Sequence, residues 1–116
     1  MTILIVEDDP SVLTLVDRLL TAKGHTVLAA HDPDDAAFVL AEHAQPPDLL
    51  LTDIVLPGRT GLEYAQAMKA TYPLLKVVFM TGWAHRGPSA LRTGIGPLLR
   101  KPFTAQELYD AIENEK

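Results

Sequence analysis

Residues 48–58 read DLLLTDIVLPG, and this stretch decides the fold. Its leucines are consecutive and do not alternate with polar residues, which is typical of a strand covered on both faces in a parallel sheet. The run stops at Asp53, an ionisable residue directly after a buried strand. Pro57 and Gly58 then indicate a turn. We therefore predict a buried parallel strand over residues 48–52 with a carboxylate at its carboxyl end.

Further apolar runs of strand length alternate with segments of helical periodicity. They cover residues 3–6, 26–30, 76–80 and 98–99. Capping signals precede the helical segments at Asp9-Pro10, Asp32-Pro33, Thr60 with Glu63, and Thr104 with Glu107. Alternating strands and helices predict an α/β fold, a (βα)5 doubly wound five-stranded parallel sheet with helices on both faces. The Gly- and Pro-rich region 83–97 predicts only a short helix, around residues 89–93.

Length and composition narrow the class of protein. With 116 residues, 47% of them hydrophobic, we expect a single domain over residues 1–116 and no effector domain. The formal net charge of −5 disfavours non-specific binding to nucleic acid or to an anionic membrane. The absence of cysteine excludes disulfides, thiolate metal sites and cysteine nucleophiles. No run is long enough to span a membrane and no signal peptide is recognisable, so we expect a cytoplasmic protein.

Polar residues stand at the carboxyl ends of four predicted strands. Glu7 and Asp8 follow the first strand, Asp53 the third, Thr81 the fourth and Lys101 the fifth. In an open α/β sheet these ends line the crevice in which ligands bind. Each residue alone also has a structural explanation, as a first-turn acid, a cap, a turn residue or a solvated lysine. Their convergence on one predicted edge favours a functional site.

The chemistry of this group indicates a metal-assisted phosphoryl site. Clustered carboxylates repel one another, and a hard divalent cation such as Mg²⁺ relieves the repulsion through oxygen ligands. Glu7, Asp8 and Asp53 are the candidate ligands. If Asp53 attacks phosphorus, the metal and Lys101 would neutralise the new negative charge, and Thr81 would donate a hydrogen bond to a phosphoryl oxygen. The product would be an aspartyl phosphate, a labile species suited to a switch.

The motifs resemble those of the response-regulator receiver domains of two-component signalling, over essentially the whole chain. Residues 3–9 resemble the family's first strand and acidic pair. Residues 49–57, with Gly61 beyond them, resemble the phosphoacceptor segment. Residues 77–82 resemble the switch-threonine strand, and residues 101–103 the Lys-Pro-Phe ending. The resemblance implies a flavodoxin-like, CheY-like fold with strand order 2-1-3-4-5.

The resemblance also implies a role for each site residue. Asp53 is then the phosphoacceptor, and Thr81 and Lys101 contact the phosphoryl group. The implied ligands of Mg²⁺, for which Mn²⁺ can substitute, are the side chains of Glu7, Asp8 and Asp53 and the backbone carbonyl of Val55. The Lys101-Pro102 peptide bond is expected to be cis.

The implied partners follow from the same family. The phosphoryl donor would be a sensor histidine kinase or a histidine phosphotransfer protein, and phosphorylation would switch contacts with an unknown output protein. The protein would be a monomer or weak dimer, free-standing or the receiver of a hybrid kinase. It would phosphorylate and dephosphorylate itself and would not be a turnover enzyme.

Two features depart from the family pattern. Leu98 stands where many receivers carry an aromatic residue, which puts an aromatic relay through the fifth strand in doubt. The segment between Thr81 and Lys101 is also a residue or two shorter than the family pattern. Val55 and Trp83 lie near positions that affect hydrolysis of the phosphoaspartate, so they are candidates for shielding it; packing of Trp83 over a short helix is the alternative.

Other functional classes fit these residues less well. A degenerate receiver would act as a binding module that never carries phosphate, and the intact set of pocket residues argues against it. An aspartate-nucleophile phosphatase needs a second acid two residues after the nucleophile, where Val55 stands. A flavodoxin-like cofactor carrier is disfavoured because residues 7–11 are acidic and contain no glycine to receive a phosphate.

Overall fold

The computed structural model describes residues 1–82 and 95–114. Its elements in chain order are β1 (Thr2–Val6), α1 (Pro10–Ala22), β2 (Thr26–Ala30), α2 (Pro33–Glu42), β3 (Leu49–Asp53), β4 (Val55–Leu56), β5 (Arg59–Thr60), α3 (Gly61–Thr71), β6 (Lys76–Thr81), β7 (Leu98–Arg100) and α5 (Ala105–Asn114). The helix predicted around residues 89–93 lies outside the described residues. Within the described ranges, no helix has the length and apolar character needed to cross a membrane.

The main sheet has five strands in the order β2-β1-β3-β6-β7, and every neighbouring pair is parallel. Because β6 and β7 are the fourth and fifth strands of this sheet, the predicted order 2-1-3-4-5 is confirmed. Residues 54–60, predicted only as a loop, also contain the antiparallel pair β4–β5. Gly58, with φ of +80°, makes the turn between these two short strands.

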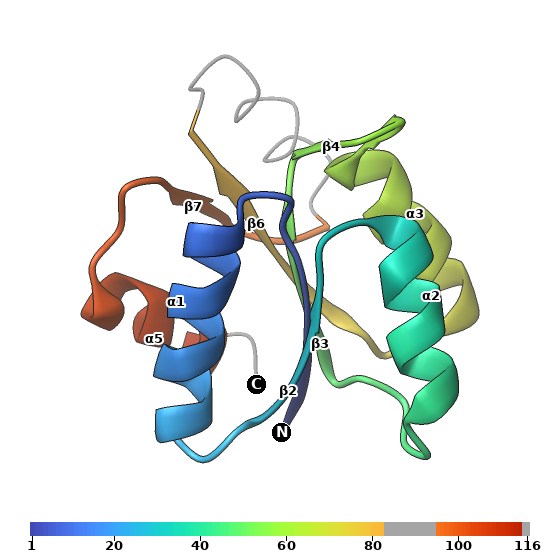
Figure 1. The fold of residues 1–116 in the computed structure, drawn as a ribbon, viewed down its shortest axis with the longest axis horizontal. Helices are drawn as coiled ribbons and strands as arrows, with labels where there is room; N and C mark the ends of the chain where they lie inside the picture. Colours follow the sequence, from blue (N-terminus) through green and yellow to red (C-terminus); the bar gives the residue numbers. More distant parts are fainter. Residues whose placement is uncertain (83–94, 115–116) are drawn as a thin grey trace.

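Two helical layers cover the sheet, with α1 and α5 on one face and α2 and α3 on the other (Figure 1). Successive leucines of β3 supply both layers of the core. Leu49 and Leu51 are fully buried among the residues of the α1 and α5 side, and Leu50 is fully buried on the α2 and α3 side. The unbroken leucine run is therefore explained by a strand that buries both of its faces.

Local capping fixes where the helices begin. Asp9 accepts a hydrogen bond from the Ser11 amide at 2.9 Å, immediately before Pro10 opens α1. Asp32 caps α2 in the same way, and the predicted capping boxes are present at α3 and α5. Because α1 and α2 start a few residues after β1 and β2, their capping residues Asp9 and Asp32 lie just beyond the carboxyl ends of these strands.

Candidate functional site

Three carboxylates meet at the carboxyl edge of the sheet. Glu7 and Asp8 follow β1, and Asp53 ends the adjacent strand β3, whose Thr52 is in register with Val6. One carboxylate oxygen from each acid lies within 4.8 Å of the others. Glu7 and Asp53 are buried, whereas Asp8 is exposed. The structure therefore brings the predicted acids together around a small volume that opens to solvent on the side of Asp8.

Lys101 reaches this cluster from the fifth strand of the sheet. It follows β7, and its backbone amide donates to the carbonyl oxygen of Thr81 at 2.8 Å. Its Nζ donates to Oδ2 of Asp53 at 2.7 Å and also forms an ion pair with Oε1 of Glu7. The Lys101–Pro102 peptide bond is cis, as the family resemblance implies. One ammonium group thus bridges carboxylates from two different strands.

Burial and the neighbouring charges shift the pKa values of Glu7 and Lys101. Burial, together with the neighbouring Asp53 carboxylate, raises the pKa of Glu7 to about 8, although the Lys101 ammonium counteracts part of this effect. For Lys101, burial alone would lower the pKa, but its hydrogen bonds to Asp53 and Glu7 outweigh burial and raise the pKa overall. Lys101 alone therefore does not offset the burial of Glu7, whose side chain keeps its proton at neutral pH in the metal-free protein.

The donor set of this cluster suits a hard divalent cation. Glu7 has no solvent exposure, and its Oε2 atom is buried without a hydrogen-bond partner among the described residues. An orphaned buried carboxylate oxygen is costly unless something binds it. Every side chain in the cluster offers oxygen, the ligand type that Mg²⁺ prefers. The residues present therefore fit a magnesium ion.

Val55 and Thr81 lie beside the acids in different ways. The Val55 amide donates to Oδ1 of Asp53 at 3.0 Å, and its side chain is 47% exposed. Thr81 is the buried last residue of β6, one position beyond Met80, which is in register with Asp53. The metal contact of the Val55 carbonyl and the phosphoryl contact of Thr81 stay predictions. Trp83, proposed with Val55 as a shield, lies outside the described residues.

The sequence did not assign roles to two residues that contact the backbone of Asp53. Thr52 donates from its hydroxyl to the carbonyl oxygen of Asp53 at 3.0 Å. Gly61, at the start of α3, has its Cα pressed against the same peptide. A hydroxyl that interrupts a buried apolar run is the signal that could have identified Thr52. The family resemblance already includes Gly61, but its close contact with the Asp53 peptide is visible only in the tertiary structure.

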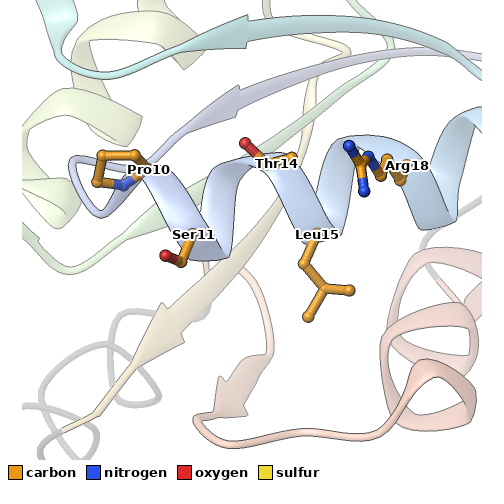
Figure 2. Close-up of a pocket in the computed structure, with 5 residues that line it drawn as sticks. All are labelled: Pro10, Ser11, Thr14, Leu15 and Arg18. Atoms are coloured by element: carbon orange, nitrogen blue, oxygen red, sulfur yellow. The ribbon is translucent and has the colours of Figure 1, made fainter.

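The exposed side of α1 forms a shallow surface next to the site. One hollow is lined by Pro10, Ser11, Thr14, Leu15 and Arg18, and Ser11 and Leu15 project from the same side of the helix (Figure 2). A second, mostly apolar hollow is lined by Val12, Leu15, Lys101, Pro102 and Phe103. Leu15, which is 52% exposed, belongs to both. An exposed apolar surface therefore extends from α1 to Lys101.

Most of the chain is similar in sequence to a known family and to its members. A family model described as the response regulator receiver domain matches residues 3–113. The chain is 35% identical to the chemotaxis protein CheY of Pseudomonas aeruginosa over 97% of this chain and 94% of that protein. It is 32% identical to the DNA-binding transcriptional regulator NtrC of Salmonella typhimurium over 94% of this chain. The chain spans only 23% of the length of NtrC, and likewise 23% of the response regulator protein FleR.

Solved structures agree with these relatives. The receiver domain of NtrX from Brucella abortus superposes with a TM-score of 0.85 at 32% identity, covering 97% of this chain and 96% of that one. A response regulator receiver domain protein from Clostridium thermocellum superposes with a TM-score of 0.86 at 29% identity, covering 98% and 92% of the two chains. The similarity in sequence and the similarity in structure thus both indicate response regulator receiver domains.

Proposed function

The chain belongs to the family of response regulator receiver domains of two-component systems, and from this we propose that Asp53 accepts a phosphoryl group with the help of Mg²⁺. The observation that carries the proposal is the arrangement around Asp53. Its carboxylate shares one small volume with Glu7 and Asp8 and lies 2.7 Å from the Lys101 ammonium. The proposed nucleophile, the proposed cation ligands and the Lys101 ammonium therefore lie together.

The reaction transfers a phosphoryl group to the Asp53 side chain. A carboxylate oxygen of Asp53 forms a bond to phosphorus while the bond between phosphorus and the donor nitrogen breaks. The donor imidazole keeps the electron pair of that bond and takes up a proton. Lys101 is placed to pair with the added negative charge, and we propose that Thr81 donates its hydroxyl proton to a phosphoryl oxygen. Because the product remains on the chain, the protein acts as a switch and turns over no substrate pool.

The cation would be held by Glu7, Asp8 and Asp53, with the Val55 carbonyl as a further ligand. When bound, Mg²⁺ supplies charge neutralisation between the carboxylates and the phosphoryl oxygens. Mn²⁺ offers the same preference for oxygen ligands and would substitute. The buried Oε2 of Glu7, which has no hydrogen-bond partner in the described part of the chain, supports this assignment, since a cation would satisfy it.

The donor would be a phosphohistidine on a sensor histidine kinase or a histidine phosphotransfer protein. It must bring its imidazole to the carboxyl edge of the sheet, next to Lys101. The apolar hollow shared by Leu15, Lys101 and Phe103 adjoins that edge and is suited to a helical partner with apolar side chains. We propose that this α1 surface receives the donor, and that the phosphorylated protein then changes its contacts with an output protein.

Acetyl phosphate tests the chemistry without a partner. With Mg²⁺ present, wild type should gain the mass of one phosphoryl group in intact-protein mass spectrometry. Asp53→Asn should gain none, because the amide is no nucleophile. Asp34→Asn, which removes an exposed acid in the first turn of α2, serves as the matched control and should react like wild type. Unmodified wild type would favour the alternative, a degenerate receiver that binds partners without phosphorylation.

A further inference from the structure

The peptide group that joins Asp53 to Ile54 is held through all of its polar atoms. The Ile54 amide donates to the carbonyl oxygen of Met80 on β6 at 2.9 Å. The Asp53 carbonyl oxygen accepts the buried hydroxyl of Thr52 at 3.0 Å. The next carbonyl, that of Ile54, accepts the amide of Gly61. The backbone directly after Asp53 is therefore fixed by β6, by β3 itself and by the start of α3.

Gly61 permits an approach that no other residue allows. A Cβ built on it would lie 2.8 Å from the carbonyl carbon of Asp53, 2.9 Å from Cα of Ile54, and closer still to the Asp53 carbonyl oxygen. These obstructing atoms are backbone, so they cannot rotate away as a flexible side chain would. The requirement for glycine is steric, since Gly61 is not among the residues with positive φ.

Thr52 is a polar residue that directly follows three buried leucines in β3. It is fully buried in β3, and the alternation of the strand places it on the face of Leu50, in the layer of α2 and α3. A buried hydroxyl must find a hydrogen-bond partner. Thr52 finds it in the carbonyl of the residue that follows it.

We propose that Thr52 and Gly61 are positioning residues for the phosphoacceptor. By fixing the Asp53–Ile54 peptide, they place the following amide, that of Val55, on Oδ1 of Asp53 at 3.0 Å. Oδ2 is then left facing Lys101. The carboxylate is thus held in one orientation before the phosphoryl donor arrives, which is the kind of alignment that accelerates transfer. This inference rests on the proposed role of Asp53 as phosphoacceptor.

A matched pair of substitutions at Thr52 separates positioning from packing. Thr52→Val keeps the shape and removes the hydroxyl, whereas Thr52→Ser keeps the hydroxyl and removes a methyl group. We expect Thr52→Val to take up the phosphoryl group from acetyl phosphate about tenfold more slowly than wild type, and Thr52→Ser to stay within about twofold. Equal rates for the two variants, or a slower Thr52→Ser, would overturn the role of the hydroxyl.

Gly61→Ala tests the close approach, with Gly24→Ala as the control. Gly24 has φ of +92° and nothing within 4 Å of a built Cβ, so alanine there strains the backbone far from the site. Both variants should lose stability. Only Gly61→Ala should slow phosphorylation per folded molecule, on the order of 10²-fold. An unchanged rate in folded Gly61→Ala would contradict the proposal, and if that variant does not fold, the Thr52 pair decides.

A spectroscopic measurement separates this inference from the proposed function. In the metal-free, unphosphorylated protein, the Val55 amide resonance and its hydrogen exchange report the bond to Asp53. Thr52→Val should shift that resonance and speed its exchange, whereas Thr52→Ser should leave both near wild type. If wild type takes up no phosphoryl group, the proposed function fails, yet the Val55 resonance still tests the positioning. An unmoved resonance in Thr52→Val would refute it.

Discussion

Lys101 supplies the positive charge that contacts the carboxylates of the site. Its ammonium contacts Asp53 and Glu7, so it competes with any cation for the same oxygens. It would also stabilise the phosphoryl group once transfer begins. The same side chain would therefore oppose metal binding and assist the proposed chemistry.

This double role gives a prediction for Lys101→Ala. Removing the competing charge should tighten Mg²⁺ binding by a few-fold up to about tenfold. Phosphorylation by acetyl phosphate should nevertheless slow by about 10²-fold, because a fixed positive charge is lost. Metal titration followed by NMR and intact mass measured over time would check the two effects. A variant that loses metal affinity together with rate would contradict the competition.

Glu7 makes the stability of the metal-free protein depend on pH. Its pKa is raised from 4.5 to about 8, chiefly by burial, so the folded protein keeps a proton that the unfolded chain has lost. The stability linked to this proton is fully present below the unfolded pKa of 4.5 and is lost as pH rises through the folded value of about 8. We therefore expect the Tm in EDTA to fall across this window.

Glu7→Gln is the control for that pH dependence. The amide mimics the protonated acid at every pH, so the Tm of this variant should fall less than that of wild type. Each kcal/mol of stability corresponds to roughly 4 °C in Tm for a domain of this size. Adding Mg²⁺ to wild type should restore stability at the alkaline end, because the cation takes the place of the proton. Parallel curves for the two proteins would argue against Glu7 as the titrating group.

Among the elements, α1 presents the surface proposed to receive the donor. Leu15 contributes to both hollows along this helix, and the one that includes Lys101 is mostly apolar. On the opposite face of the sheet, α2 exposes Phe38, which is 65% accessible. These two exposed residues provide a comparison between a surface near the site and one away from it.

Leu15→Arg should slow phosphotransfer from a phosphorylated histidine protein by about tenfold or more, because a charge in the apolar hollow disfavours docking. Its reaction with acetyl phosphate should be unchanged, since the small donor needs no docking surface. Phe38→Arg should leave both reactions near wild type. Radiolabel transfer from a panel of phosphorylated histidine proteins would measure the phosphotransfer rate of each variant. A loss of both reactions in Leu15→Arg would indicate damage to the site itself.

At the scale of the whole molecule, the two core layers share the central strand β3. Leu50 and Leu51 are neighbours in sequence, both fully buried, and each belongs to a different layer. We expect Leu50→Ala and Leu51→Ala each to lower the free energy of unfolding by about 2–5 kcal/mol. Urea denaturation followed by circular dichroism should show a single transition in both variants. A two-step curve in either one would show that the layers unfold separately.

Much of this molecule could be predicted from its sequence because local signals and global topology agree. The leucine run predicted a doubly covered strand, and the Asp-Pro and Thr–Glu pairs predicted helix starts, all of which the structure confirms. Acids placed at the ends of β1 and β3 had to meet once the strands were parallel neighbours. The grouping of Glu7, Asp8 and Asp53 follows from that rule.

Other features depend on distances that a linear pattern does not encode. The β4–β5 pair forms because Gly58 turns the chain back, and a Pro-Gly dipeptide indicates only that some turn occurs. The contact of Gly61 with the Asp53 peptide requires α3 to begin against the end of β3. The bond from Thr52 to the following carbonyl depends on a rotamer. Such short-range geometry becomes visible only after the elements are packed.

The bridge made by Lys101 has a mechanical consequence. β7 is a three-residue strand at the edge of the sheet, and β6 is its one neighbour among the strands that the structure describes. The lysine that follows it is tethered to acids two and three strands away. If negative charge accumulates on Asp53, the Lys101 ammonium is drawn toward Asp53 and its contact with Glu7 weakens. A chemical change on the central strand β3 would thereby act on β7, the shortest strand of this sheet.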